Sequence, residues 1–252
     1  MNQEEKTAFI IDFADRSFRD TADQDYIMAR LAYRLRLDTQ FRWNSLQAVE
    51  KYLKAILLYN GQSAKAIRHS LVTALNKVRE IADLGFCIPE STSAFIEYLD
   101  NFGDDRYLSF PTYVPSRALI KLDKTVWLIR RYCFYMRHEF RTGESVINTF
   151  ELNKKKLSEV QYEKRPASYR LANGYLERII DKRLPAYDDL VWKNFFFGRV
   201  TKHRIRFGDR FSTTNPTHFL NPECFEELHK LVDFPPAIVE ELTGRRSERK
   251  KK

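Results

Sequence analysis

The sequence predicts a mainly α-helical protein, because its apolar residues recur at the three- and four-residue spacing of amphipathic helices. Of the 252 residues, 43% are hydrophobic and 14% are aromatic, which is enough for a substantial core. Only eight glycines and nine prolines are present, too few for the frequent turns of an all-β architecture. We therefore expect an all-α fold, in which an antiparallel helical bundle is followed by a mainly helical C-terminal region.

The bundle is expected to occupy residues 1–145. Its predicted helices cover 23–37, 41–59, 69–82, 91–99 and 115–138, with an aromatic loop over 100–114. Asp23 and the pair His69-Ser70 are expected at helix N-termini. Two apolar stripes are expected to face each other: Leu46, Val49, Leu53, Ile56 and Leu57 on one helix, and Leu119, Leu122, Val126 and Ile129 on the last. Short loops between the helices favour antiparallel neighbours.

The chain after residue 145 is less regular. Residues 146–166 are charged and are expected to form a linker or an exposed helix. A C-terminal helical region is expected at 167–244, with helices over 168–182, 188–196 and 221–232. Glycines at two bends of residues 198–211 also allow this segment to form a small β-hairpin. Residues 245–252 are expected to be a basic disordered tail.

The net charge of +9 is concentrated at one end of the sequence. The last eight residues, RRSERKKK, carry +5 of it, so the remainder is close to balanced. The three cysteines form no CxxC pair, which is typical of free thiols in a reducing compartment. The first residues lack signal-peptide character, and no run approaches the roughly 18 apolar residues that span a bilayer. We expect a soluble cytoplasmic protein without a membrane segment.

Residues 43–75 carry motifs in a characteristic order. Ala48, Glu50, Lys51, Leu53, Lys54 and Ala55 form an A-x-E-K-x-L-K-A element on one predicted helix. His69-Ser70-Leu71 opens the next helix, and Asp105-Arg106-Tyr107 precedes the long helix at 115–138. In this order and spacing the chain resembles the HEPN family over roughly residues 20–140.

The resemblance implies a small helical bundle that forms homodimers. Many HEPN proteins are metal-independent RNases in which an arginine and a histidine, roughly four to six residues apart, meet at the start of the last long helix. The histidine would act as acid or base, and the arginine would stabilise charge on the phosphorus. After Arg106, however, positions 111–113 are Pro-Thr-Tyr. The nearest comparable pair is Arg131 and His138, which the expected helix places on one face, and these are the candidate catalytic residues.

The family-motif residues also have a purely local interpretation, which we favour over ligand contact. Glu50, Lys51 and Lys54 lie within about one helical turn and can form the charged flank of the core stripe. His69 can pack or hydrogen-bond at the start of its helix. Arg106 completes this set of motif residues.

The strongest nucleic-acid signal is the segment KNFFFGRVTKHRIRFGDRF, residues 193–211. Bases interleaved with aromatic residues can follow a phosphate backbone and offer stacking faces. The candidate nucleic-acid-binding residues are Lys193, Arg199, Lys202, Arg204, Arg206 and Arg210. In the alternative interpretation, the phenylalanines form the core of the C-terminal region and the bases are its exposed face.

Neither a cofactor nor a metal is predicted. The sequence lacks GxxxxGK[ST], GxSxG and HExxH, which removes the P-loop, hydrolase-elbow and zincin classes. His203, His218, Cys224 and His229 all lie in the C-terminal region, but their spacing matches no tight zinc site.

These observations lead to two functional hypotheses. The first is a HEPN-like protein that binds RNA or a nucleotide-bearing partner, with metal-independent endoribonuclease activity as its catalytic version. The second is a non-catalytic protein-interaction module, such as the structural partner of a nucleotidyltransferase-type protein. The absence of a histidine after Arg106 favours binding without catalysis. A homodimer is expected in addition, since isologous dimers are the commonest soluble oligomers.

Overall fold

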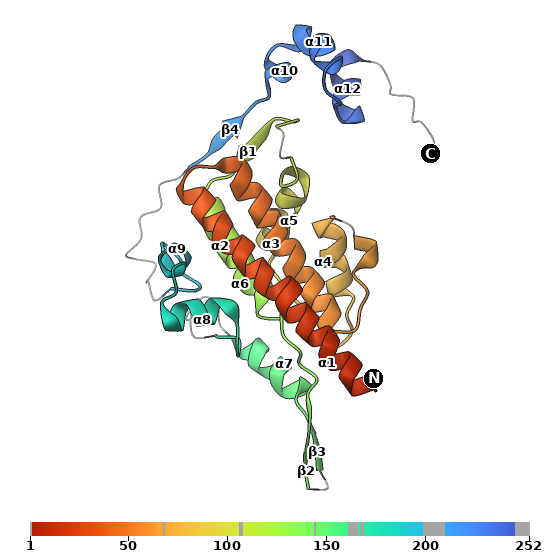
Figure 1. Cartoon of the computed structure of the whole chain (residues 1–252), viewed down its shortest axis with the longest axis vertical. Coiled ribbons are helices and arrows are strands. Elements are labelled where there is room, and N and C mark those ends of the chain that lie inside the picture. Colours follow the sequence, from red (N-terminus) through yellow and green to blue (C-terminus); the bar gives the residue numbers. More distant parts are fainter. Residues whose placement is uncertain are drawn as a thin grey trace.

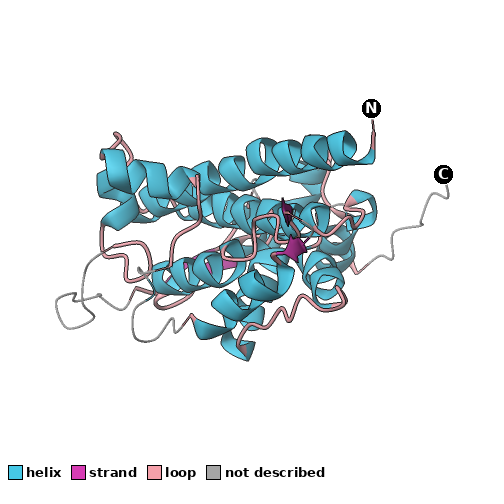
Figure 2. Cartoon of the chain, turned by 90° about the horizontal axis from the view of Figure 1, so that it is seen from below, coloured by secondary structure: helices cyan, strands magenta, loops and turns pink. Residues whose placement is uncertain are grey.

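The computed structural model describes residues 2–67, 69–105, 108–143, 145–160, 166, 169–198 and 210–244. Helices make up most of this described part of the chain (Figure 2), and the prediction of a mainly helical protein is confirmed. The two small antiparallel sheets found in it are two-stranded. Within the described ranges, no helix is both long enough and apolar enough to cross a membrane.

The first helical rod is longer than expected. It begins with α1 (Gln3–Phe13), passes through a π-helical stretch, η1 (Ala14–Arg19), and continues as α2 (Asp20–Arg34). Asn2 caps α1, because its side chain accepts a hydrogen bond from the Glu5 amide at 2.8 Å. The predicted start of a helix at Asp23 is wrong, because Asp23 is fully buried inside the rod.

The central helix α3 (Asp38–Tyr59) packs along α2 and agrees with the prediction. Every member of its predicted apolar stripe is buried: Leu46, Val49, Leu53, Ile56 and Leu57. After the short η2 (Lys65–Ile67), α4 (Leu71–Arg79) begins at Ser70, whose hydroxyl accepts a hydrogen bond from the Thr73 amide at 3.2 Å. The Asp100 carboxylate of α5 (Glu90–Phe102) also accepts a hydrogen bond from the Leu71 amide at 2.6 Å, so α5 stabilises the start of α4.

Helix α6 (Ala118–Arg130) supplies the opposite apolar stripe, and it is in contact with α3. Leu119, Leu122, Val126 and Ile129 are fully buried, as predicted. The expected continuation to residue 138 is wrong. The last turn tightens through a hydrogen bond from the Cys133 amide to the Arg130 carbonyl at 2.8 Å. Beyond the helix end, the Met136 carbonyl accepts a hydrogen bond from the Thr149 hydroxyl at 2.7 Å.

An unpredicted hairpin follows α6. Strands β2 (Glu139–Thr142) and β3 (Ser145–Asn148) pair antiparallel, with Phe140 opposite Ile147. Gly143 in the turn has a φ of 62°, which favours glycine there. The hairpin projects away from the bundle, and α7 (Phe150–Glu159) returns the chain toward it (Figure 1).

The other sheet joins distant parts of the sequence. Strand β1 (Thr112–Val114), which lies within the expected loop, pairs antiparallel with β4 (Ser212–Thr214). The partner of β4 is therefore β1, whereas most of the segment suggested as a hairpin, 199–209, lies outside the described residues.

The C-terminal region divides between two places. Helices α8 (Tyr175–Lys182) and α9 (Tyr187–Val191) lie against the bundle, and their Leu176, Ile179 and Leu190 side chains belong to the main core. Beyond β4, the short elements α10 (Thr217–Leu220), η5 (Pro222–Cys224), α11 (Phe225–His229) and α12 (Pro236–Thr243) gather at the far end of the molecule from the hairpin (Figure 1).

We predict that Leu53→Ala lowers the free energy of unfolding by about 2–5 kcal/mol, because it opens a cavity at a fully buried position of α3. Leu231→Ala is the matched control, since this leucine is 82% exposed and should change stability by less than about 0.5 kcal/mol. Urea denaturation of both variants measures the difference. Equal effects would contradict the placement of α3 in the core.

Candidate functional site

The candidate catalytic residues do not share a helix. Arg131 follows the last residue of α6, and its guanidinium lies 5.3 Å and 5.1 Å from the ring centroids of Trp127 and Tyr132. His138 lies beyond the helix end and is exposed, with its ring edge-on to Tyr135 at 5.0 Å. The expected common helical face is therefore wrong, because the helix ends before Arg131. A role for either residue in RNA cleavage stays a prediction.

The family-motif residues that the structure describes are engaged in local pairs. Lys54 forms an ion pair with the buried carboxylate of Glu50, one turn away on α3. The Nδ1 atom of His69 lies 3.4 Å from the Glu50 carboxylate, although the His69 side chain is 77% exposed. Lys51 pairs with Asp25 of α2. These contacts are compatible with the local interpretation of the motif.

Two of the candidate nucleic-acid-binding residues fall within the described ranges. The Nζ atom of Lys193 lies 5.0 Å from the ring centroid of Trp192. Arg210 forms an ion pair with Asp38 at the start of α3 and donates a hydrogen bond to the Tyr33 carbonyl at 3.3 Å, so it anchors the chain before β4. The other candidates, Arg199, Lys202, Arg204 and Arg206, and the motif residue Arg106 lie outside the described residues.

The phenylalanines of that segment differ in environment. Phe196 is buried, and Phe195 and Phe197 are partly buried against the main core. Phe211 is 61% exposed, although its ring lies 5.9 Å from that of Tyr113. The first three phenylalanines therefore belong to the core, whereas Phe211 faces solvent beside the β1–β4 sheet.

The principal polar feature of the interior is a buried guanidinium that the sequence analysis did not identify. Arg130, at the end of α6, is 2% exposed. Its Nε and Nη2 atoms donate to the two carboxylate oxygens of Asp23 at 2.7 and 2.8 Å. Its Nη1 and Nη2 atoms donate to the Glu177 carboxylate at 2.8 and 2.7 Å. Arg130 thus joins α6 to α2 on one side and to α8 on the other.

Each carboxylate of this ion triad has a further partner. The hydroxyl of the fully buried Tyr52 donates to Asp23. The Leu171 amide donates to Glu177 at 3.0 Å. Gly174 is required beside the triad, because a Cβ atom at this position would lie 1.9 Å from a Glu177 carboxylate oxygen.

A second buried arginine lies along α2. Arg30 pairs with Asp123 of α6, and the Tyr26 hydroxyl donates to the same carboxylate at 2.6 Å. Arg30 also donates to the backbone carbonyls of Asp189 and Trp192, which ties α9 to the bundle. The Asn194 amide completes this group by donating to the Tyr26 hydroxyl at 2.9 Å.

Burial and pairing shift the pKa values of the triad. Burial raises the pKa of Asp23, and the interaction with Arg130 offsets only part of this rise. Burial also acts to raise the pKa of Glu177, but attraction to Arg130 outweighs it and the net shift is downward. For Arg130, burial acts to lower the pKa, whereas the two carboxylates outweigh burial and raise it well above its ordinary value. The guanidinium therefore stays charged in the interior.

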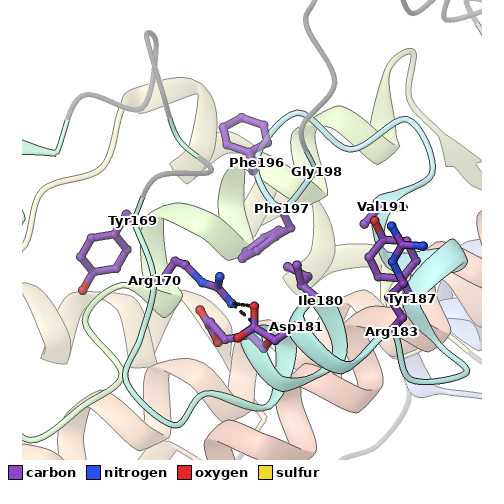
Figure 3. A pocket seen from close by; sticks show the side chains of 11 residues that line it. Tyr169, Arg170, Ile180, Asp181, Arg183, Tyr187, Val191, Phe196, Phe197 and Gly198 are labelled. Carbon is purple, nitrogen blue, oxygen red and sulfur yellow. Dashed lines mark hydrogen bonds and ion pairs between the residues drawn. The ribbon is translucent and has the colours of Figure 1, made fainter.

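A cavity of about 510 Å³ lies beside the triad, between α8, α9 and the turn at 194–198. Glu177 contributes to its wall and connects it to Arg130. The remaining lining residues, all labelled in Figure 3, are Tyr169, Arg170, Ile180, Asp181, Arg183, Tyr187, Val191, Phe196, Phe197 and Gly198. The cavity therefore combines aromatic rings with charged groups.

The charged side chains around the cavity differ in whether they have an oppositely charged partner. Arg170 pairs with Asp181 at 2.7 Å, the interaction drawn at the centre of Figure 3. Glu177 pairs with Arg130 behind it, and Arg130 is shared with Asp23. Arg183 is exposed, and its guanidinium lies 5.6 Å from the ring centroid of Tyr187. Among the described residues, no acidic side chain pairs with Arg183, so this cation is available to an anionic ligand.

Metal binding finds no support in the part of the chain that the structure describes, where no group of three or more His, Cys, Asp or Glu side chains could hold an ion. The Nε2 atom of His218 lies 3.0 Å from the Ser109 carbonyl oxygen. His229 stacks on Phe225 at a centroid distance of 5.6 Å. The remaining histidine weighed for zinc, His203, lies outside the described residues.

Comparison with family models, curated proteins and solved structures finds no match to this chain.

The pKa of Glu177 leads to a prediction about stability. Because the folded-state pKa lies below the ordinary 4.5, the stabilisation by ionised Glu177 is complete above pH 4.5 and is lost as the pH falls through the folded-state pKa. Glu177→Gln should lower the free energy of unfolding by roughly 1–3 kcal/mol near neutral pH. It should also lose stability less steeply than the parent protein on acidification.

Denaturant titrations at a series of pH values measure this effect. Glu151→Gln is the matched control, because the Glu151 side chain is 77% exposed and pairs only with Lys154 at 3.8 Å among the described residues. If the two variants showed the same acid dependence as the parent protein, the role assigned to the Glu177–Arg130 pair would be wrong.

Proposed function

We propose that the chain binds RNA or a nucleotide-bearing partner through the cavity between α8, α9 and the 194–198 turn. The observation that carries this proposal is the presence, around one cavity, of aromatic rings and of Arg183, a cation without an acidic partner among the described residues. A base can stack on the ring of Tyr187 or Phe197 while the Arg183 guanidinium contacts a phosphate. Arginine suits this task because its planar group presents several donors at once.

The size and position of the cavity support the proposal. Its volume of about 510 Å³ lies within the usual range of ligand sites, roughly 300–1,000 Å³. Gly198 lines the cavity and immediately precedes Arg199, one of the basic residues of the predicted nucleic-acid segment. We expect the basic residues of that segment to supply further phosphate contacts.

We further propose that the bundle is HEPN-like and serves as a platform without catalysis. The order of the motif elements supports this assignment, since Glu50 and Lys54 lie on α3 and Ser70 caps the following helix. Arg131 and His138 both lie beyond the end of α6, so they do not share a helical face, and this favours binding over cleavage.

We predict that Arg183→Ala weakens binding of a labelled single-stranded RNA pool by about tenfold, as expected for a lost phosphate contact of roughly 1–2 kcal/mol. The slope of log affinity against log salt concentration should fall by about one unit. Fluorescence anisotropy over a salt series measures both quantities. Arg79→Ala is the control, since Arg79 lies on α4, where it donates to Ser93 at 2.7 Å, and α4 and α8 lie on opposite sides of the bundle (Figure 1).

Two outcomes would overturn this proposal. If the parent protein bound no RNA even at low salt, the cavity would need another ligand, and a co-purifying protein would then favour the interaction-module hypothesis. If Arg183→Ala and Arg79→Ala weakened binding equally, general charge and not the cavity would account for it.

We predict that the purified protein leaves the RNA pool intact with or without EDTA, and that His138→Ala leaves RNA affinity unchanged. His138 lies outside both the cavity and α6, so its removal takes away no proposed contact. Gel analysis of the incubated pool tests this directly. Cleavage that survives EDTA and disappears in His138→Ala would instead establish a metal-independent RNase.

A further inference from the structure

The hairpin of β2 and β3, residues 139–148, is called the arm here. Figure 1 shows it extending away from the bundle, beyond α7. Its apolar side chains face solvent: Phe140 is 57%, Val146 is 58% and Ile147 is 50% exposed. An isolated two-stranded hairpin is marginally stable in water, and exposed apolar residues grouped on a projecting element mark interaction sites. We therefore expect the arm to pair with another molecule that covers these side chains.

The free edge of β3 has a defined hydrogen-bonding pattern. The Thr149 amide donates to the His138 carbonyl at 2.9 Å, which makes 138 and 149 a hydrogen-bonded pair. Hydrogen-bonded and non-hydrogen-bonded pairs alternate along an antiparallel ladder. With the observed register, Ile147 therefore bonds inward to Phe140. The backbone amides and carbonyls of Val146 and Asn148 point outward, away from β2.

This outer edge also lacks the features that keep strand edges apart. Strand β3 reads Ser-Val-Ile-Asn, without charge or proline, and all four residues are exposed. Natural proteins usually protect a free edge with lysine, proline, an inward-pointing charge or a covering element. An uncharged edge has no like-charge repulsion when it meets a second copy of itself, so the strand is compatible with self-pairing.

We propose that β3 pairs antiparallel with β3 of a second copy of this chain, about a two-fold axis at Ile147. In this register Val146 of one copy exchanges both backbone hydrogen bonds with Asn148 of the other, and the same exchange occurs on the other side of the axis. The two arms form one four-stranded antiparallel sheet. This pairing satisfies the outward amides and carbonyls of both strands.

The side chains match this register. Residues directly opposite each other on neighbouring strands point to the same face of a sheet. Ile147 lies opposite Phe140 within each arm, and the two copies of Ile147 meet at the axis. One face of the sheet therefore carries a continuous apolar row from Phe140 of one copy, across both isoleucines, to Phe140 of the other. Pairs of aromatic and β-branched residues are among the cross-strand pairs that stabilise antiparallel sheets.

We predict a mass of twice the 30.0 kDa chain mass when the intact protein is measured by light scattering at micromolar concentration. Ile147→Lys should yield the monomer, because it places two like charges opposite each other at the axis. Ser145→Lys is the matched control on the same strand, since it adds the same charge opposite Thr142 within the arm and opposite Thr149 of the other copy, and it should leave the dimer intact. Circular dichroism verifies that both variants retain their helices.

Cross-linking supplies a second, independent readout. In a Cys87→Ser, Cys224→Ser background, which removes the exposed thiols, Ile147→Cys should form a covalent dimer on mild oxidation. Val146→Cys should remain monomeric on a non-reducing gel. A parent protein that stays monomeric, or a dimer that survives Ile147→Lys, would overturn the proposal. Since RNA binding enters neither experiment, its failure would leave the result unaffected.

Discussion

The buried guanidinium of Arg130 links three helices of the fold through two carboxylates. It lies at the point where α2, α6 and α8 meet, and it donates to Asp23 on one side and Glu177 on the other. Bidentate arginine–carboxylate pairs are strong and directional, so they fix the relative positions of the elements that carry them. Removing Arg130 would leave two buried carboxylates without their shared partner, and an uncompensated buried charge typically costs about 3–5 kcal/mol. Because Glu177 also lines the cavity, the same contact that attaches α8 to the bundle shapes the candidate binding site.

The second arginine extends this principle along α2. Arg30 holds Asp123 of α6 and the carbonyls that end α9, while Asn194 reaches Tyr26. The face of α2 that carries Asp23, Tyr26 and Arg30 is thus completely enclosed, and residues 171–198 supply the cover. Buried polar groups are tolerated only when they are hydrogen-bonded, so this face of α2 requires the C-terminal segment. Helices α8 and α9 are therefore an integral part of the core and not an appendage to it.

The sequence predicted the apolar half of this architecture and missed the polar half. The stripes of α3 and α6 were recognisable because only buried helical faces repeat leucine, valine and isoleucine at such spacing. The buried polar stripe of α2 was not recognisable, because Asp23, Tyr26 and Arg30 at three- and four-residue spacing resemble a solvent-exposed face. Their partners Asp123, Glu177 and Asn194 lie far along the chain, and no local pattern links them. The end of α6 was missed for a similar reason, since the Met136 carbonyl beyond it is held by the hydroxyl of Thr149, 13 residues further along the chain. The arm had a signal in Thr142-Gly143, where a glycine separates two short alternating runs.

The Arg130 triad attaches α8, and with it the cavity, to the helical bundle. Hydrogen–deuterium exchange of Arg130→Met, compared with the parent protein, tests this attachment, because methionine keeps much of the volume and removes the charge. We expect the amides of α8 and α9 to lose protection by a large factor, whereas those of α4, which is capped independently by Ser70 and Asp100, should keep theirs. Unchanged protection of α8, or an equal loss in α4 and α8, would contradict it.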